Sequence, residues 1–373
     1  MPLGAADSSR AANGVDGTTI RTLPRSIVLL LGIAGAVALG FGIKGAAGII
    51  APTMLAFVLT IAVLPIYKLA GRHRWPNWAA ILTALVAAYL ILVIMVVGVV
   101  VCVVKFADLL PTYAKQADDL TKDVTNFLDN LGLSTSETST ALSNLDPMKL
   151  IGPLTDLASG VLGAFGSLFF LVTLMFFFVV AVPGFAPRAR AFQYAKPELA
   201  AAFAKFLQGS QTYLLMTALF GAIVGVLDAG ALWLLGVPLP LVWGFFSFLT
   251  NFIPNIGFVI GVIPPAFLAL LDGGWSEMLW VIVAYSVLNV TIQTFIQPRI
   301  VGNSVGLSAE ITFMSLVVWT FLLGALGALL AVPMTLLFRA IFLDSDDRTR
   351  WVAPLIDATV SEDALPPAAA ETG

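Results

Sequence analysis

Long apolar runs recur along this chain at the length that a helix needs to cross a lipid bilayer. Such a helix takes about 20 mostly apolar residues. Hydrophobic residues fill 59% of the 373 positions and charged residues only 11%, whereas ordinary soluble domains hold about 45–50% and about 25%. A water-soluble core could not absorb that excess, so we expect lipid around the chain. Six runs have the length of one simple span: 27–43, 46–69, 78–104, 160–182, 213–235 and 278–297.

Two further apolar stretches, 239–271 and 307–343, are long for one span and short for two. Glycine and proline interrupt both stretches, and re-entrant hairpins would fit their length. We therefore predict an all-α fold, a polytopic membrane helix bundle of about eight segments in which two are Gly/Pro-broken and suited to re-entry. The transporter domain is expected at 26–343, between disordered cytoplasmic tails at 1–25 and 344–373.

The residue types that usually carry enzyme chemistry are scarce. The one cysteine, Cys102, sits in the apolar run VVGVVVCVVKF and is expected to be a packing residue. The one histidine, His73, lies between two arginines, so the usual metal sites and Ser/His/Asp catalysis lack their parts. A net charge of −3 gives no field that would attract nucleic acid. We predict a protein that is not an enzyme and that needs no metal or cofactor.

Lysine and arginine gather in alternate connections, which predicts the orientation in the membrane. They occur in the N-terminal tail, after the second span and in the connection 184–212: Arg10, Arg21 and Arg25; Lys68, Arg72 and Arg74; Arg188, Arg190, Lys196 and Lys205. We expect these segments and both termini to be cytoplasmic, in a multi-pass protein of the cell (plasma) membrane. The connection 105–157 has four lysines against eight acids and suits the outer side.

The outer connection is expected to contain an amphipathic helix, because its apolar residues recur at three- and four-residue spacing. They are Leu109, Tyr113, Leu120, Val124, Phe127, Leu128 and Leu131. The helix either forms a lid or partner surface, or lies on the bilayer or the bundle. The segment 197–207 is interpreted as a cytoplasmic counterpart that leads into the fifth span and docks at the inner interface.

The stretch 239–271 loses its apolar pattern midway, at Asn251, Pro254, Asn255, Gly257 and Gly261. Proline removes a backbone donor and glycine makes a helix easy to unwind, so the backbone should be broken here. Open backbone inside a bilayer survives only against protein or a watery cavity. The break therefore marks a cavity or a packed crossing point.

The stretch 307–343 has a similar plan, with a break at Gly324 and Gly327 and a further proline, Pro333. A true internal repeat and a chance likeness both stay open. Paired Gly/Pro-broken segments nevertheless point to a transporter binding site, since broken helix ends present free backbone groups to a solute.

Three amides, Asn289, Gln293 and Gln297, recur every four residues along the span 278–297. They face a solute or form interhelical hydrogen bonds. Pro298 and Arg299 close this helix.

Three charged residues lie close to these segments. Arg299 either snorkels to lipid headgroups or pairs with Glu310 or with carbonyl groups freed at a broken helix end. Re-entry of both long stretches puts Arg299 inside, and simple crossing puts it outside. Asp228 and Glu310 are the acids expected at membrane depth, where ionisable groups are functional candidates. We consider both as coupling acids, although Asp228 could simply be wetted at its helix end.

Four strings give the chain a family resemblance: LGVPLPLVWGFFSFLTNFIPNIG, GVIPPAFLALL, QPRIVGNSVGLS and SLVVWTFLLGALGALLAVPMTLL. In order and spacing they resemble the AI-2E family of transporters, in particular its autoinducer-2 exporter branch. The resemblance implies a bundle of about eight membrane segments, a homo-oligomer, and export of a small polar signal such as autoinducer-2. Residues that match family motifs are Pro254, Asn255, Gly257, Pro298, Arg299, Gly302, Gly324, Gly327 and Pro333.

The leading hypothesis is a secondary exporter of a small polar solute, because the ATP-binding motif G-x-x-x-x-G-K-[ST] is absent. Two alternatives are a proton-coupled monovalent cation antiporter that uses Asp228 and Glu310, and a non-transporting membrane scaffold that binds a partner through its outer loop. The expected partners are the solute, the lipid bilayer and further copies of the chain.

Overall fold

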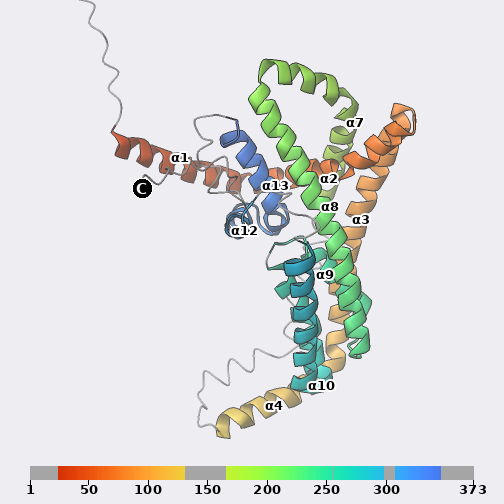
Figure 1. Ribbon diagram of the computed structural model, residues 1–373. Coiled ribbons are helices and arrows are strands. Elements are labelled where there is room, and N and C mark those ends of the chain that lie inside the picture. The colour runs from red at the N-terminus through yellow and green to blue at the C-terminus, as the bar shows by residue number, and fades with distance from the viewer. Residues whose placement is uncertain (1–23, 131–164, 255, 298–306, 346–373) are drawn as a thin grey trace, which may run out of the picture.

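The computed structural model describes residues 24–130, 165–254, 256–297 and 307–345, and their regular elements are all helices (Figure 1). Within these residues, six helices are long and apolar enough to cross a membrane. Many of their exposed side chains are large and apolar, such as Leu234, which is 79% exposed, and Trp233, which is 72% exposed. Such a surface suits lipid, and the predicted class of polytopic helix bundle is confirmed.

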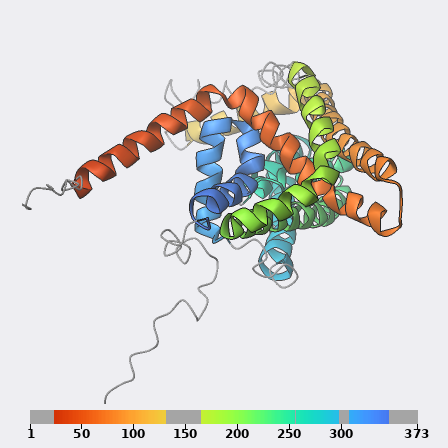
Figure 2. The same ribbon diagram turned by 90° about the horizontal axis from the view of Figure 1, so that it is seen from above.

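The first three helices are α1 (Arg25–Gly45), α2 (Ala47–Arg72) and α3 (Asn77–Leu109). They match the first three predicted spans to within a few residues. α1 extends away from the other helices (Figures 1 and 2), and its large apolar side chains are exposed. α2 and α3 pack with α7 around buried small and apolar side chains, among them Ala88 and Met175.

Helices α7 (Phe165–Ala195) and α8 (Pro197–Leu234) meet at Lys196. The segment 197–207, interpreted as leading into the fifth span, forms the first turns of α8 and continues into that span without a break. Pro197 starts the helix at the position where its missing N–H costs nothing. No further proline follows within the 38 residues of α8, so the helix runs on for about 57 Å.

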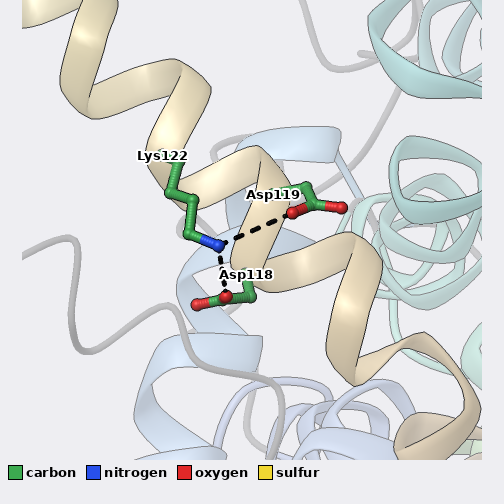
Figure 3. A network of polar contacts seen from close by, with 3 residues as sticks. All are labelled: Asp118, Asp119 and Lys122. Atoms are coloured by element: carbon green, nitrogen blue, oxygen red, sulfur yellow. Dashed lines mark hydrogen bonds and ion pairs between the residues drawn. The ribbon is translucent and has the colours of Figure 1, made fainter.

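The outer connection begins with η1 (Leu110–Tyr113) and α4 (Ala114–Asn130), so the predicted amphipathic helix is present. Its first turns are anchored by Tyr113, whose hydroxyl group donates to Asp272 at 3.1 Å. On the exposed face, Lys122 contacts Asp118 at 2.7 Å and Asp119 at 3.7 Å (Figure 3). The hydrogen bond to Asp118 raises the pKa of Lys122. The α7–α8 junction and the α2–α3 turn lie toward the end of the molecule opposite α4 (Figure 1).

The stretch 239–271 folds as a hairpin that enters and leaves at the same end. Its first arm is α9 (Pro240–Thr250), whose 11 residues cover only about 16 Å of a bilayer core about 30 Å thick. Its second arm begins α10 (Gly257–Val290), which reverses at Gly274, where φ is 75° and ψ −163°. The start of α9 and the segment before Gly274 share one apolar cluster with Tyr113 of the outer connection. The stretch is therefore re-entrant.

The stretch 307–343 is also a hairpin, made of α12 (Ala309–Leu323) and α13 (Ala325–Phe342) on either side of Gly324. The indole N–H of Trp319 donates to Thr335 across it at 3.0 Å. The two hairpins touch, because Ile253 and Ile256 at the tip of the first pack against the apolar cluster built on the second. The two broken segments of the sequence thus meet in space.

Candidate functional site

The site is built where α9 lies against α8. Backbone contacts backbone there, since a Cβ on either Gly225 or Gly244 would overlap the carbonyl oxygen of the other residue. A Cβ on Gly221 would stand only 3.0 Å from the side-chain nitrogen of Asn251. Close approach of this kind is how membrane helices gain packing energy when water does not drive them together. We call this contact the α8–α9 seam, defined by Gly221, Gly225 and Gly244.

Two long-range hydrogen bonds hold the end of α9 on α8. The amide group of Asn251 donates to the carbonyl oxygen of Thr217 at 3.1 Å, and the hydroxyl group of Tyr213 donates to the carbonyl oxygen of Phe252 at 3.2 Å. Non-helical backbone at this depth needs such partners within the protein. Helix α8 thus holds the tip of the hairpin through one side chain and one backbone carbonyl group of the tip.

The amides of α10 reach this tip. The side-chain NH2 group of Gln293 donates to the carboxamide oxygens of Asn251, at 3.4 Å, and of Asn289, at 3.3 Å. Asn289 is buried and donates to the carbonyl oxygen of Tyr285 at 2.9 Å. Gln293 lies in η2 (Thr291–Ile296), a π-helical segment, which is a feature often found at functional sites. The three amides form one connected chain, which we call the amide chain: Asn251, Gln293 and Asn289.

The polar cluster continues from the amide chain to Asp228 on α8. Asp228 is fully buried, and the polar side chains nearest to its carboxyl group are Ser247 of α9 and Asn289 of α10. Ser247 in turn donates to the hydroxyl oxygen of Tyr285 at 3.5 Å. Helices α8, α9 and α10 therefore each contribute polar groups to one buried cluster.

Two pockets in the described part of the chain are mostly apolar and lie away from the amide chain. One, of about 590 Å³, lies between α7 and α8 beside Phe192 and Phe203. The other, of about 400 Å³, lies between α3 and α9 beside Cys102 and Phe245. Cys102 is buried there, which confirms its predicted packing role. The amide chain offers hydrogen-bond donors and acceptors that these two apolar pockets lack.

Comparison with known proteins shows which family the chain belongs to. The sequence profile described as AI-2E family transporter matches residues 27–345. The chain belongs to that family. It is similar to the AI-2 transport protein TqsA of Escherichia coli (strain K12), with 29% identity over 313 residues, which is 84% of this chain and 90% of TqsA. YhhT of the same strain, whose name proposes transport without naming a solute, is 32% identical over 309 residues, 82% of this chain and 88% of YhhT.

In this AI-2E transporter the glycines of the first break serve close packing. A Cβ on Gly257 would overlap the carbonyl oxygen of Thr250, and one on Gly261 would stand 3.0 Å from the hydroxyl oxygen of Thr250 and 3.5 Å from that of Ser247. Pro254 lies in the turn between the arms. Of the two predicted outcomes for this break, a packed crossing point is the one observed.

Other predicted residues lie apart from the amide chain. Gln297 has no hydrogen-bond partner among the described residues, so no described bond joins it to Gln293. Glu310 is exposed in the first turn of α12. Gly324, Gly327 and Pro333 belong to the second hairpin, where Gly327 packs on the backbone of Trp319. The residues outside the described part are Asn255, Pro298, Arg299 and Gly302.

The glycines of the α8–α9 seam were not predicted, and neither were four polar residues of the site: Tyr213, Thr217, Ser247 and Tyr285. The signal for two of them was present, since Tyr285 precedes Asn289 by four residues and Ser247 precedes Asn251 by four. Extending each polar stripe by one helical turn would have included both. Tyr213 and Thr217 act on a distant part of the chain, and Thr217 does so through its backbone, which no sequence pattern records.

Proposed function

We propose that this AI-2E transporter exports a small, polar, hydroxylated solute of the autoinducer-2 kind. The observation that carries the proposal is the amide chain at the tip of a re-entrant hairpin, where Gln293 joins Asn251 and Asn289. The likeness to TqsA, a protein named for AI-2 transport, supports the choice of solute.

Carboxamides suit such a solute because each offers both a hydrogen-bond donor and an acceptor. The two hydrogen bonds of Gln293 are long, at 3.4 Å and 3.3 Å, and they share one NH2 group. Hydroxyl groups of a solute can replace both at little cost. In the described state the amides satisfy one another, so binding requires the hairpin tip to move and the amide chain to exchange partners.

The driving force is proposed to be an ion gradient or the concentration difference of the solute. The phosphate-binding motif of ATP-driven pumps is absent from the sequence. Movement of a short hairpin against a fixed long helix such as α8 would alternately expose the amide chain to the two sides, as in other secondary transporters.

Labelled autoinducer-2 and inverted membrane vesicles provide the test. Vesicles that contain the parent protein should accumulate label above vesicles without it. Gln293→Leu should reduce the initial rate by about tenfold, the equivalent of losing about 1.4 kcal/mol, because it removes the group that links the amide chain. Gln297→Leu, on the same helix and without a described partner, is the matched control and should transport like the parent. Uptake by Gln293→Leu at the parent rate would remove the amide chain from the mechanism.

Absence of uptake by the parent would exclude autoinducer-2 but not transport of another solute. Cation exchange is then the second candidate, because Asp228 is a buried acid in the same cluster. The flux of labelled sodium against a pH gradient measures it. Deletion of residues 115–145 distinguishes transport of either kind from a scaffold role. A transporter should keep residual flux without its outer loop, whereas a partner-binding scaffold should lose its function.

Assembly and location belong to the same proposal. We propose a homo-oligomer in the cell membrane with both termini in the cytoplasm. The exposed apolar side chains of α1, such as Leu30 and Phe41, and its position away from the other helices (Figure 2) support association with a second copy. Chemical cross-linking in the membrane tests the assembly. Labelling of single cysteines placed in the α7–α8 junction and in α4 tests the orientation, because only the latter should react from outside.

A further inference from the structure

Asp228 is the buried group whose surroundings the packing of the helices does not explain. Its exposed fraction is 0%, and neither carboxyl oxygen has a hydrogen-bond partner within the described part of the chain. Buried polar atoms are nearly always hydrogen-bonded, so an exception needs a reason of its own. In a membrane helix the default reason for an ionisable side chain is function.

The groups that face Asp228 come from α9 and α10. They are the hydroxyl group of Ser247, the phenol group of Tyr285 and the amide group of Asn289. Tyr285 is the titratable one among them. The ion pairs formed between described residues involve Lys122 and Arg339 and none of them includes Asp228. The carboxyl group therefore has no counter-ion in this part of the chain.

The neighbours direct their hydrogen bonds elsewhere. Ser247 donates to the hydroxyl oxygen of Tyr285, and Asn289 donates to the carbonyl oxygen of the same residue. The carboxamide oxygen of Asn289 accepts from Gln293. A carboxylate ion at this position would be a buried charge without a counter-ion, with only the neutral groups of Ser247 and Asn289 beside it, which is a costly state in a protein interior. The closed arrangement fits a carboxyl group that carries a proton.

We propose that Asp228 is a proton-binding site of this transporter, which keeps its proton while α9 is packed on α8 and releases it to water when the hairpin moves away. In the release step the O–H bond of the carboxyl group breaks, the proton passes to water, and the carboxylate keeps the electron pair. The coupling to a solute rests on the proposed function, whereas proton binding in the closed state does not.

The α8–α9 seam is the element that links the proton to movement. Gly225 lies three residues before Asp228 on α8, so separation at the seam admits water to the carboxyl group. Burial penalises the ion far more than the neutral acid, so the neutral acid favours the closed seam and the ion favours the open one. A bound proton can shift the equilibrium only through this difference between the two states. Asn289 belongs both to the surroundings of Asp228 and to the amide chain, so solute and proton act on the same movement.

The experiment uses the full chain in proteoliposomes with labelled autoinducer-2 and an imposed pH gradient. If one proton moves per solute, each pH unit should support a solute gradient of about tenfold. Asp228→Asn keeps the neutral shape and cannot release a proton. It should still exchange solute down its concentration gradient but should build no gradient from a pH difference. Glu310→Gln removes an exposed acid and should leave the coupling intact.

Infrared difference spectroscopy of the same samples reads the proton directly. The C=O band of a protonated carboxyl group should be present at neutral pH in the parent and in Glu310→Gln, and missing in Asp228→Asn. If Asp228→Asn does not fold, Asp228→Glu gives the second reading, because it should retain the band at a shifted position.

Accumulation by Asp228→Asn equal to that of the parent would overturn the proposal, as would a parent without the band at neutral pH. Loss of the band on addition of sodium would show that sodium displaces the proton from Asp228, which supports proton binding and favours cation exchange over the proposed solute. A parent that shows the band but moves no autoinducer-2 would support proton binding and contradict only the proposed solute.

Discussion

The α8–α9 seam gives a prediction whose size can be worked out from the structure. Gly225→Ala places a methyl group against the carbonyl oxygen of Gly244, inside the van der Waals contact that begins at about 3.4 Å. The two helices must move apart by about 1 Å to accept it. The hydrogen bonds from Asn251 and Tyr213, at 3.1 Å and 3.2 Å, would then exceed hydrogen-bonding distance.

These effects set the expected loss of stability. Overpacking of a tight contact costs about 1–3 kcal/mol, and each lost hydrogen bond adds about 0.5–1.5 kcal/mol. Alanine returns about 1 kcal/mol through its better helix propensity. The free energy of unfolding should therefore fall by about 1–5 kcal/mol.

Unfolding of the purified protein in mixed micelles by increasing amounts of a denaturing detergent measures this change. Gly230→Ala is the matched control, because Gly230 is exposed on the same helix and a Cβ there meets nothing within 4 Å. The control should be as stable as the parent or slightly more stable. If Gly225→Ala unfolds together with Gly230→Ala, the seam is not a backbone contact and the argument for the closed site fails.

Two further predictions concern the other breaks and the outer helix. Gly324 has φ of 69° and ψ of −151°, and a Cβ there would meet nothing within 4 Å. Gly324→Ala should therefore lower the free energy of unfolding by about 1–3 kcal/mol through backbone strain alone. Gly48→Ala, in a helix with equal space, should not lower it in the same unfolding assay. Tyr113→Phe removes the hydrogen bond to Asp272 and should release α4, seen as faster proteolysis of the outer connection; Tyr194→Phe, at a residue 94% exposed, should leave the cleavage rate unchanged.

Much of the architecture was predictable because it depends on chain length and backbone chemistry. The 11-residue arm before Asn251 and the reversal near Gly324 follow from where glycine and proline interrupt apolar runs. The amphipathic helix after Leu109 was predicted because its apolar residues recur at three- and four-residue spacing. Such signals are local, so a single sequence contains them in full.

The partners within the site were not predictable, because the membrane helices carry almost no facial pattern. Lipid-facing and core-facing positions are both apolar, so periodicity does not reveal which side of α8 meets α9. The row Gly221, Gly225 and Asp228 can be recognised as one face only when α9 is seen against it. The change from α- to π-helix at Thr291 likewise leaves no mark in composition.

The depth at which α9 ends explains why the polar groups are collected there. A helix that stops inside the bilayer leaves backbone and side-chain groups that lipid cannot satisfy, so the protein must provide their partners. Asn251, Asn289 and Gln293 satisfy one another, and backbone groups of α8 and of the hairpin tip complete the set. Among the described residues, buried side-chain atoms without a partner occur only on Ser210 and Asp228. A hydroxyl group in that state stays neutral at a cost of about 1–3 kcal/mol, but a carboxyl group must either hold a proton or bear an uncompensated charge. Hydrogen bonds account for the amides of the cluster, whereas Asp228 is the member that the closed arrangement leaves without a hydrogen-bond partner among the described residues.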